Sequence, residues 1–116
     1  MIKVNTGLIA DWYTPASEKD SEKPARFKLK PLDGMQYVEL CGEAKFTESG
    51  GMVPTRKATE IALKAALVDW ENIDEANDRP LKFSPHNFKH LPAEILSELV
   101  NEILIRSTLT EDDSKN

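Results

Sequence analysis

The sequence predicts a single α+β domain that is mainly helical, with a small β element packed on three to four helices. Its length of 116 residues suits one domain rather than two. One short segment alternates between polar and apolar residues, as a strand does, and two longer segments have the periodicity of helices. We expect the strand near residues 26–30, a short hairpin near residues 72–83, and the folded domain over residues 25–107.

The composition argues against several classes of function. Hydrophobic residues make up 40% of the chain and charged residues 30%, and 20 acidic against 15 basic side chains leave a net charge of −5. This charge disfavours a protein that binds nucleic acid or an anionic membrane, because both are negative. No apolar run is long enough for a membrane-spanning helix or a signal peptide. The single cysteine, Cys41, cannot form an internal disulfide, which fits a reducing cytoplasm.

Residues 1–24 are expected to form a loosely structured, mobile segment. Residues 16–24 are mostly small or charged, so they bury too little apolar surface to offset the entropy lost on ordering. Trp12 and Tyr13 precede this stretch. An exposed aromatic pair is typical of a segment that docks on a protein partner.

The segment RFKLK, residues 26–30, places Phe27 and Leu29 on one face of a strand and three cations on the other. A cationic face with Trp12 upstream could bind nucleic acid. The negative overall charge favours a structural interpretation, in which lysines on the wet face of an edge strand block edge-to-edge aggregation.

A short helix is predicted from about Gly34 to Cys41, because Asp33 is a favourable N-cap residue. Its inward side chains are expected to be Met35 and Val38, together with Leu40 or Cys41. Residues 45–52 contain two adjacent glycines and are typical of a flexible loop.

The helix predicted over residues 54–70 is the most informative element, because it is apolar around most of its circumference. Leu63, Leu67 and Trp70 fall together on one side of it, and three alanines lie behind. A helix of this kind belongs in the centre of a domain or in a subunit interface. Both roles stay open, since alanine-rich surfaces let a second helix approach closely.

Turn-forming residues over 72–80, followed by the apolar return 81–83, predict the small hairpin. The return strand can pair with the strand at residues 26–30. Ser84 and Pro85 predict a short helix that ends near His90, because serine suits the cap and proline the first helical position. An amphipathic helix is expected from Pro92 to about Arg106, and residues 108–116 are expected to be a disordered tail.

No catalytic constellation or cofactor site is recognisable. His86 and His90 lie four residues apart and could face one metal ion, but no third ligand accompanies them at a suitable spacing. Cys41 lies between Glu39 and Glu43, which disfavour its reactive thiolate. We therefore expect a protein that is not an enzyme and holds no metal.

Three blocks of sequence resemble the small tail assembly chaperones of long-tailed bacteriophages. They are ARFKLKPLDGMQYVEL, ALKAALVDWENI and RPLKFSPHNFKHLPAEILSELVNEI. The order is an alternating strand, a Pro-Leu turn, a short helix, a helix that ends in tryptophan, a Phe-Ser cap and a Leu-Pro helix. Together the blocks extend from Ala25 to about Ile105.

The resemblance implies a non-enzymatic protein of the host bacterial cytoplasm that binds the tape measure protein and is absent from the finished virion. It also implies a frameshift-extended form that recruits tail-tube protein. The alternatives are another phage protein, either a structural tail component or a small acidic inhibitor. For self-association or client binding, the candidate surface is Trp12, Tyr13, Leu63, Leu67 and Trp70, the last three on condition that the fold leaves them exposed.

Overall fold

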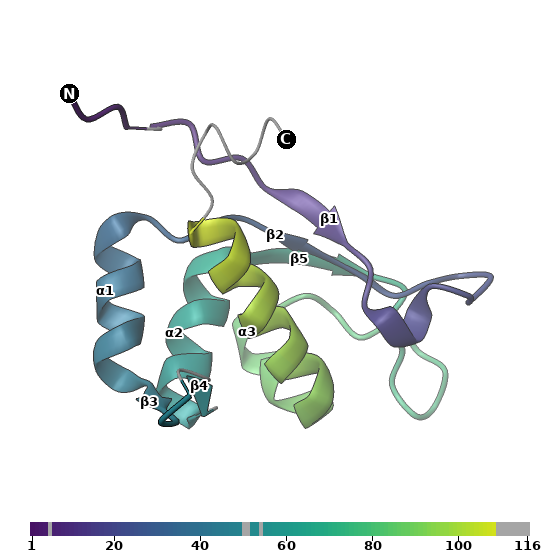
Figure 1. Ribbon diagram of the computed structural model, residues 1–116. Coiled ribbons are helices and arrows are strands. Elements are labelled where there is room, and N and C mark those ends of the chain that lie inside the picture. Colours follow the sequence, from purple (N-terminus) through teal and green to yellow (C-terminus); the bar gives the residue numbers. More distant parts are fainter. Residues whose placement is uncertain (5, 50–51, 54, 109–116) are drawn as a thin grey trace.

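A small antiparallel sheet lies above a layer of helices in the structure, a computed structural model that describes residues 1–4, 6–49, 52–53 and 55–108 (Figure 1). The sheet has the strand order β1-β2-β5, with β1 at Asp11–Tyr13, β2 at Arg26–Leu29 and β5 at Leu67–Glu71. The helices are α1 (Gly34–Glu43), α2 (Arg56–Ala66) and α3 (Ala93–Thr108), with two 3₁₀ helices, η1 (Ala16–Glu18) and η2 (Pro85–His90). Two further short strands, β3 (Lys45–Phe46) and β4 (Met52–Val53), form a separate hairpin. The predicted α+β class is confirmed.

Strand β2 is the centre of the sheet, because it pairs antiparallel with β1 on one side and with β5 on the other. Its alternation is the predicted one: Phe27 and Leu29 are buried beneath the sheet. The expectation that this segment is an edge strand is wrong. Its lysine, Lys28, therefore lies in the middle of the open face of the sheet, where it cannot protect an edge.

Residues 11–18 are not loosely structured. Strand β1 pairs with β2 through Asp11–Leu29, Trp12–Lys28 and Tyr13–Phe27, and η1 follows it. Pro15 is fully buried between them. Residues 1–4 and 6–9 are different, since the apolar side chains of Met1, Ile2, Val4 and Ile9 are exposed, and these residues extend away from the sheet (Figure 1).

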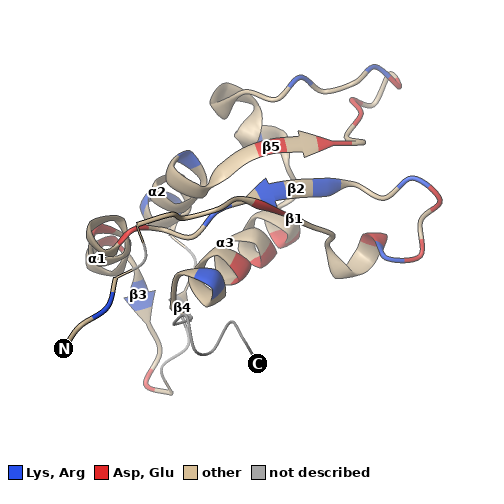
Figure 2. Ribbon diagram, turned by 90° about the horizontal axis from the view of Figure 1, so that it is seen from above, with Lys and Arg blue, Asp and Glu red and all other residues tan. Residues whose placement is uncertain are grey.

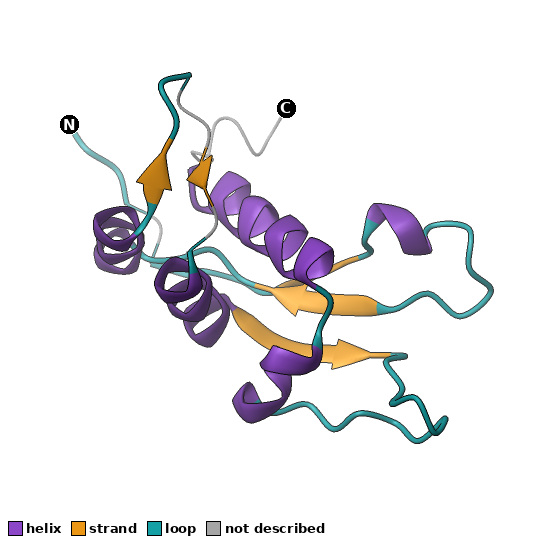
Figure 3. Cartoon of the chain, turned by 90° about the horizontal axis from the view of Figure 1, so that it is seen from below, coloured by secondary structure: helices purple, strands orange, loops and turns teal. Residues whose placement is uncertain are grey.

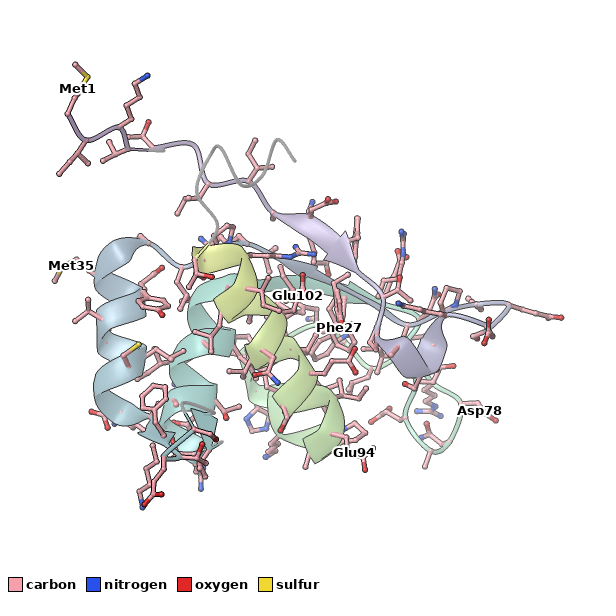
Figure 4. All side chains as sticks on the ribbon, in the orientation of Figure 1. Met1, Phe27, Met35, Asp78, Glu94 and Glu102 are labelled. Atoms are coloured by element: carbon pink, nitrogen blue, oxygen red, sulfur yellow. The ribbon has the colours of Figure 1, made fainter. Side chains whose placement is uncertain are left out.

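Helix α1 begins with a complete capping box. The Asp33 carboxylate accepts a hydrogen bond from the Gln36 N–H at 2.8 Å, and the Gln36 side chain accepts one from the Asp33 N–H at 3.0 Å. Leu40 is the fully buried residue of this helix. The expectation that Met35 and Val38 face inward is wrong, because they are 79% and 65% exposed, and Met35 points away from the body in Figure 4. The helix instead turns Tyr37, Leu40 and Cys41 to the core.

Helix α2 lies between α1 and α3 and packs on both, as a central helix should (Figure 1). Three of its four alanines, Ala58, Ala62 and Ala66, have no exposed surface, so both neighbours approach the helix closely. Thr55 caps its first turn by accepting a hydrogen bond from the Ala58 N–H.

The predicted continuation of this helix to Trp70 is wrong, since the chain becomes β5 at Leu67. Strand β5 pairs with β2, and the register shifts between Lys28 and Leu29, so that Val68 is an extra, bulged residue. The bulge lets Leu67 and Trp70 both face the core although they are three residues apart. Valine and tryptophan favour this extended conformation over the helical one.

Residues 72–84 form a long loop at one end of the sheet (Figure 3). Asp74 and Pro80 form an isolated antiparallel bridge, and the Leu81 N–H donates to the Ile73 carbonyl at 2.8 Å, so the predicted hairpin is present in reduced form. The predicted return strand at residues 81–83 is wrong: these residues are not a strand and do not pair with β2.

The last two helices begin close to their predicted positions. Ser84 caps η2 by accepting a hydrogen bond from the His86 N–H at 3.3 Å, with Pro85 in the first helical position. Helix α3 includes Thr108, which was expected in the tail, and the other residues of the predicted tail, 109–116, lie outside the described part of the chain.

Trp70 joins the sheet to the loop and to η2. Its ring packs edge-on against Phe27 at a centroid distance of 6.4 Å and against Phe83 at 5.0 Å, and it is tilted against Phe88 at 5.8 Å. The indole N–H donates to the Leu81 carbonyl at 2.9 Å. Strands β2 and β5, the loop 72–84 and η2 therefore meet at one side chain.

We expect Trp70→Ala to lower the free energy of unfolding by about 3–5 kcal/mol, because it removes a buried ring and leaves a cavity. The control is Trp12→Ala, which removes a half-exposed tryptophan and should cost about 1 kcal/mol or less. Urea unfolding followed by circular dichroism measures both changes. Equal losses in the two variants would contradict the central role of Trp70.

Candidate functional site

The two aromatic residues predicted as a docking pair lie on opposite faces of the sheet. Trp12 is on the open face, where the Arg26 guanidinium carbon lies 5.0 Å and the Lys28 amine 5.8 Å from its ring centroid. The blue segment of β2 in Figure 2 marks these cations. Arg26 also forms an ion pair with Glu71, and Lys28 is paired across the strands with Asp69, so carboxylates alternate with the cations on this face.

Tyr13 points the other way and fastens β1 to α3. Its hydroxyl donates a hydrogen bond to the Glu98 carboxylate, which also accepts one from the Ala16 N–H at 3.0 Å. Burial, followed by the hydrogen bond to Glu98 and its negative charge, raises the pKa of Tyr13 to about 12. The two aromatics thus have separate roles and do not form one docking surface.

Arg106 completes this attachment of the first strand. It donates to the Asp11 and Leu29 carbonyls at 2.9 Å each, and its Nε donates to Glu102 at 3.1 Å. The acidic stripe of α3 is visible as red segments in Figure 2, and Glu102 is labelled in Figure 4. Polar contacts along one side of α3 therefore hold β1 in the sheet.

The other predicted surface residues are in the core. Leu63, Leu67 and Trp70 are 2%, 4% and 6% exposed. Their expected contribution to self-association or client binding depended on exposure, and the structure buries all three side chains. They act on any binding surface only through the shape of the core beneath it.

A groove between α2, η2 and the start of α3 was missed from the sequence. Its volume is about 850 Å³. The buried Leu63 and Phe88 lie at its floor, Leu96 forms part of a wall, and Thr59 of α2 and Ser97 of α3 also line it. The full lining is Thr55, Arg56, Thr59, Glu60, Leu63, Lys64, Pro85, His86, Phe88, Lys89, Ala93, Leu96 and Ser97. Apolar floor and wall residues between two helices are typical of a site that accepts an apolar ligand or the apolar face of another helix.

The spacing on each helix explains why these side chains meet. On α2, the lining residues 56, 59, 60, 63 and 64 recur every three or four positions and so share one face. On α3, residues 93, 96 and 97 do the same over the first turns. The periodicity of each face is readable in the sequence, but the separation of the two helices depends on η2, whose Phe88 packs on Trp70.

Metal binding and catalysis were considered for His86, His90 and Cys41. In the described part of the chain, these side chains are not grouped as a metal site would require. His86 and His90 are exposed on η2, and in a 3₁₀ helix residues four apart point about 120° away from each other. Cys41 is half-buried on α1 and lies against Tyr37, whose pKa it raises. Within the described residues, no three histidine, cysteine or carboxylate side chains are grouped as a metal site would require.

No protein-family model, curated protein or solved structure matches this chain. Among the described helices, none has the length and hydropathy needed to span a membrane.

Replacing Tyr13 by phenylalanine should make stability less sensitive to alkaline pH. The pKa of Tyr13 is raised in the folded state from an ordinary value near 10, so its contribution to stability is complete below pH 10 and is lost as the pH rises toward 12. Wild type should therefore lose more stability than Tyr13→Phe between pH 10 and pH 12.

Urea unfolding at fixed pH steps measures this difference, and Tyr37→Phe measures the separate contribution of the other tyrosine, whose pKa is also raised. Equal alkaline slopes for wild type and Tyr13→Phe would contradict the assignment of the hydrogen bond between Tyr13 and Glu98.

Proposed function

We propose that this protein is a non-enzymatic tail assembly chaperone of a bacteriophage or prophage. In this role it binds the helical tape measure protein in the bacterial cytoplasm, keeps it soluble while the tail tube forms around it, and does not remain in the virion. The protein acts through surface complementarity, without a metal or other cofactor.

The groove between α2, η2 and α3 is the observation that carries this proposal. A chaperone for a long helical client needs a preformed apolar surface that accepts one face of a helix. Leu96 supplies half-buried apolar surface in the wall of the groove, and the buried side chains of Leu63 and Phe88 form the floor beneath it. The walls are held in place by fully buried neighbours, among them Ala62 and Leu99, so the groove can exist without the client.

The charge of the chain supports the same role. A protein that carries exposed apolar surface stays soluble more readily when its net charge is far from zero, and here it is −5. The sequence blocks that resemble tail assembly chaperones include the last five residues of α2, all of η2 and most of α3, so they cover part of the groove lining.

We expect co-expression with the tape measure protein encoded just downstream to give a soluble complex that can be recovered by pull-down. Ser97→Tyr should reduce the recovered tape measure protein at least tenfold, because a bulky ring from α3 fills the groove. Asn101→Tyr is the matched control, since Asn101 is exposed on the same helix but does not line the groove.

Both variants should unfold at the same urea concentration as wild type, to within the small change expected of a surface substitution. Three results would contradict the proposal: an insoluble tape measure protein despite folded wild type, equal recovery with the two variants, or stoichiometric amounts of this protein in purified virions. The last result would favour a structural tail component.

A further inference from the structure

The rim of the groove carries a charge opposite to that of the whole chain. Arg56, Lys64 and Lys89 line it, and His86 stands beside Lys89, with a distance of 3.5 Å between the lysine amine and the imidazole Nε2. Glu60 is the one carboxylate among the lining residues in the described part of the chain. Acidic residues outnumber basic ones 20 to 15 overall, so this excess of cations is a local property.

Glu60 neutralises only part of this rim, because it is one carboxylate among three cationic side chains. The Arg56 Nε donates to it at 3.0 Å along the helix, and this hydrogen bond is the main reason why the pKa of Glu60 is lowered. Among the described residues, no carboxylate lies within ion-pair distance of Lys64 or Lys89. Their charges stand on different elements, α2 and η2, and are available to a bound partner.

We infer that the groove takes an amphipathic helix whose apolar stripe is flanked by carboxylates, and this inference rests on the function proposed above. The stretch of α2 from Arg56 to Lys64 is about 12 Å long at a rise of ~1.5 Å per residue, so it can contact roughly two turns of a partner helix. Two or three apolar side chains of that helix contact Leu96 and the floor. Acidic side chains on its flanks meet Lys64 and Lys89.

The charged rim lets the groove distinguish between partner helices, which the apolar floor alone does poorly. Apolar contacts accept many helices of similar shape, whereas an acidic flank gains and a basic flank loses interaction with the same two lysines. Because these lysines are exposed, their effect is screened by salt, which gives the inference a measurable signature.

The test uses two fluorescein-labelled peptides, each designed as a 20-residue helix with the same leucine stripe. One carries glutamates on both flanks and the other carries lysines. Fluorescence polarisation with the full-length protein should show at least tenfold tighter binding of the acidic peptide at low salt. The difference should shrink several-fold in 0.5 M NaCl, and the bound acidic peptide should gain helical circular dichroism.

The double variant Lys64→Glu, Lys89→Glu should reverse this preference. Lys19→Glu, Lys23→Glu is the matched control, because it makes the same change in net charge at exposed residues outside the groove lining. Equal affinity for the two peptides, an unchanged preference in the groove variant, or binding without gain of helix would overturn the inference. The last result would indicate that the groove binds the peptide in a non-helical conformation.

Failure of the inference and failure of the proposed function give different results. If the groove variant still keeps the tape measure protein soluble and shows no change in peptide preference, the charge selectivity is wrong and the chaperone role stands. If wild type prefers the acidic peptide but leaves the tape measure protein insoluble, the groove has the inferred selectivity and serves another partner.

Discussion

The indole ring of Trp70 sits where the sheet, the long loop and η2 meet, and the arrangement of the remaining elements depends on it. Its contacts with Phe27, Phe83 and Phe88 are edge-on or tilted, the geometries that aromatic rings prefer. Its one polar atom is satisfied by the Leu81 carbonyl. A residue of this size at the end of a short strand holds together segments that make few backbone hydrogen bonds to each other.

The shape of the groove depends on this aromatic cluster around Trp70. Phe88 forms part of the groove floor and packs against Trp70, so the position of η2 relative to α2 is set from below by an aromatic contact. The Asn87 side chain adds a hydrogen bond to the Lys82 carbonyl at 2.8 Å, which attaches η2 to the preceding loop. The groove wall is therefore part of the packed core, although it is made from a short 3₁₀ helix.

Elements with strong local signals were predictable from the sequence, and elements that depend on distant partners were not. The alternation around Phe27 and the caps at Asp33 and Ser84 act within a few residues, and the structure has them where expected. The spacing of Leu67 and Trp70 is different, because inward positions three apart in sequence occur both on a helix and in a strand with one bulged residue. Only pairing with β2 distinguishes the two.

The same reasoning applies to the surface residues. Met35 and Val38 form a helical stripe that is as apolar as the buried one, and its exposure follows from the position of α2 rather than from α1 itself. Tyr13 pairs with Phe27 in the sheet, and its hydroxyl donates a hydrogen bond to Glu98, which lies 85 positions further along the chain. The groove could not be predicted either, since its lining comes from three elements whose separation is a tertiary property.

Helix α3 connects the groove to the first strand and limits how far either can move. Its first turns line the groove, and its later turns carry Glu98 and Arg106, which hold β1. Between and beside them Leu99, Val100 and Ile103 are almost completely buried, so a shift of the helix would disturb close-packed contacts as well as the polar attachment. An occupant that required the groove to widen would have to disrupt both sets of contacts. A partner that fits the groove with side-chain adjustments alone avoids that cost, which favours recognition of a regular helix over a bulkier or irregular segment.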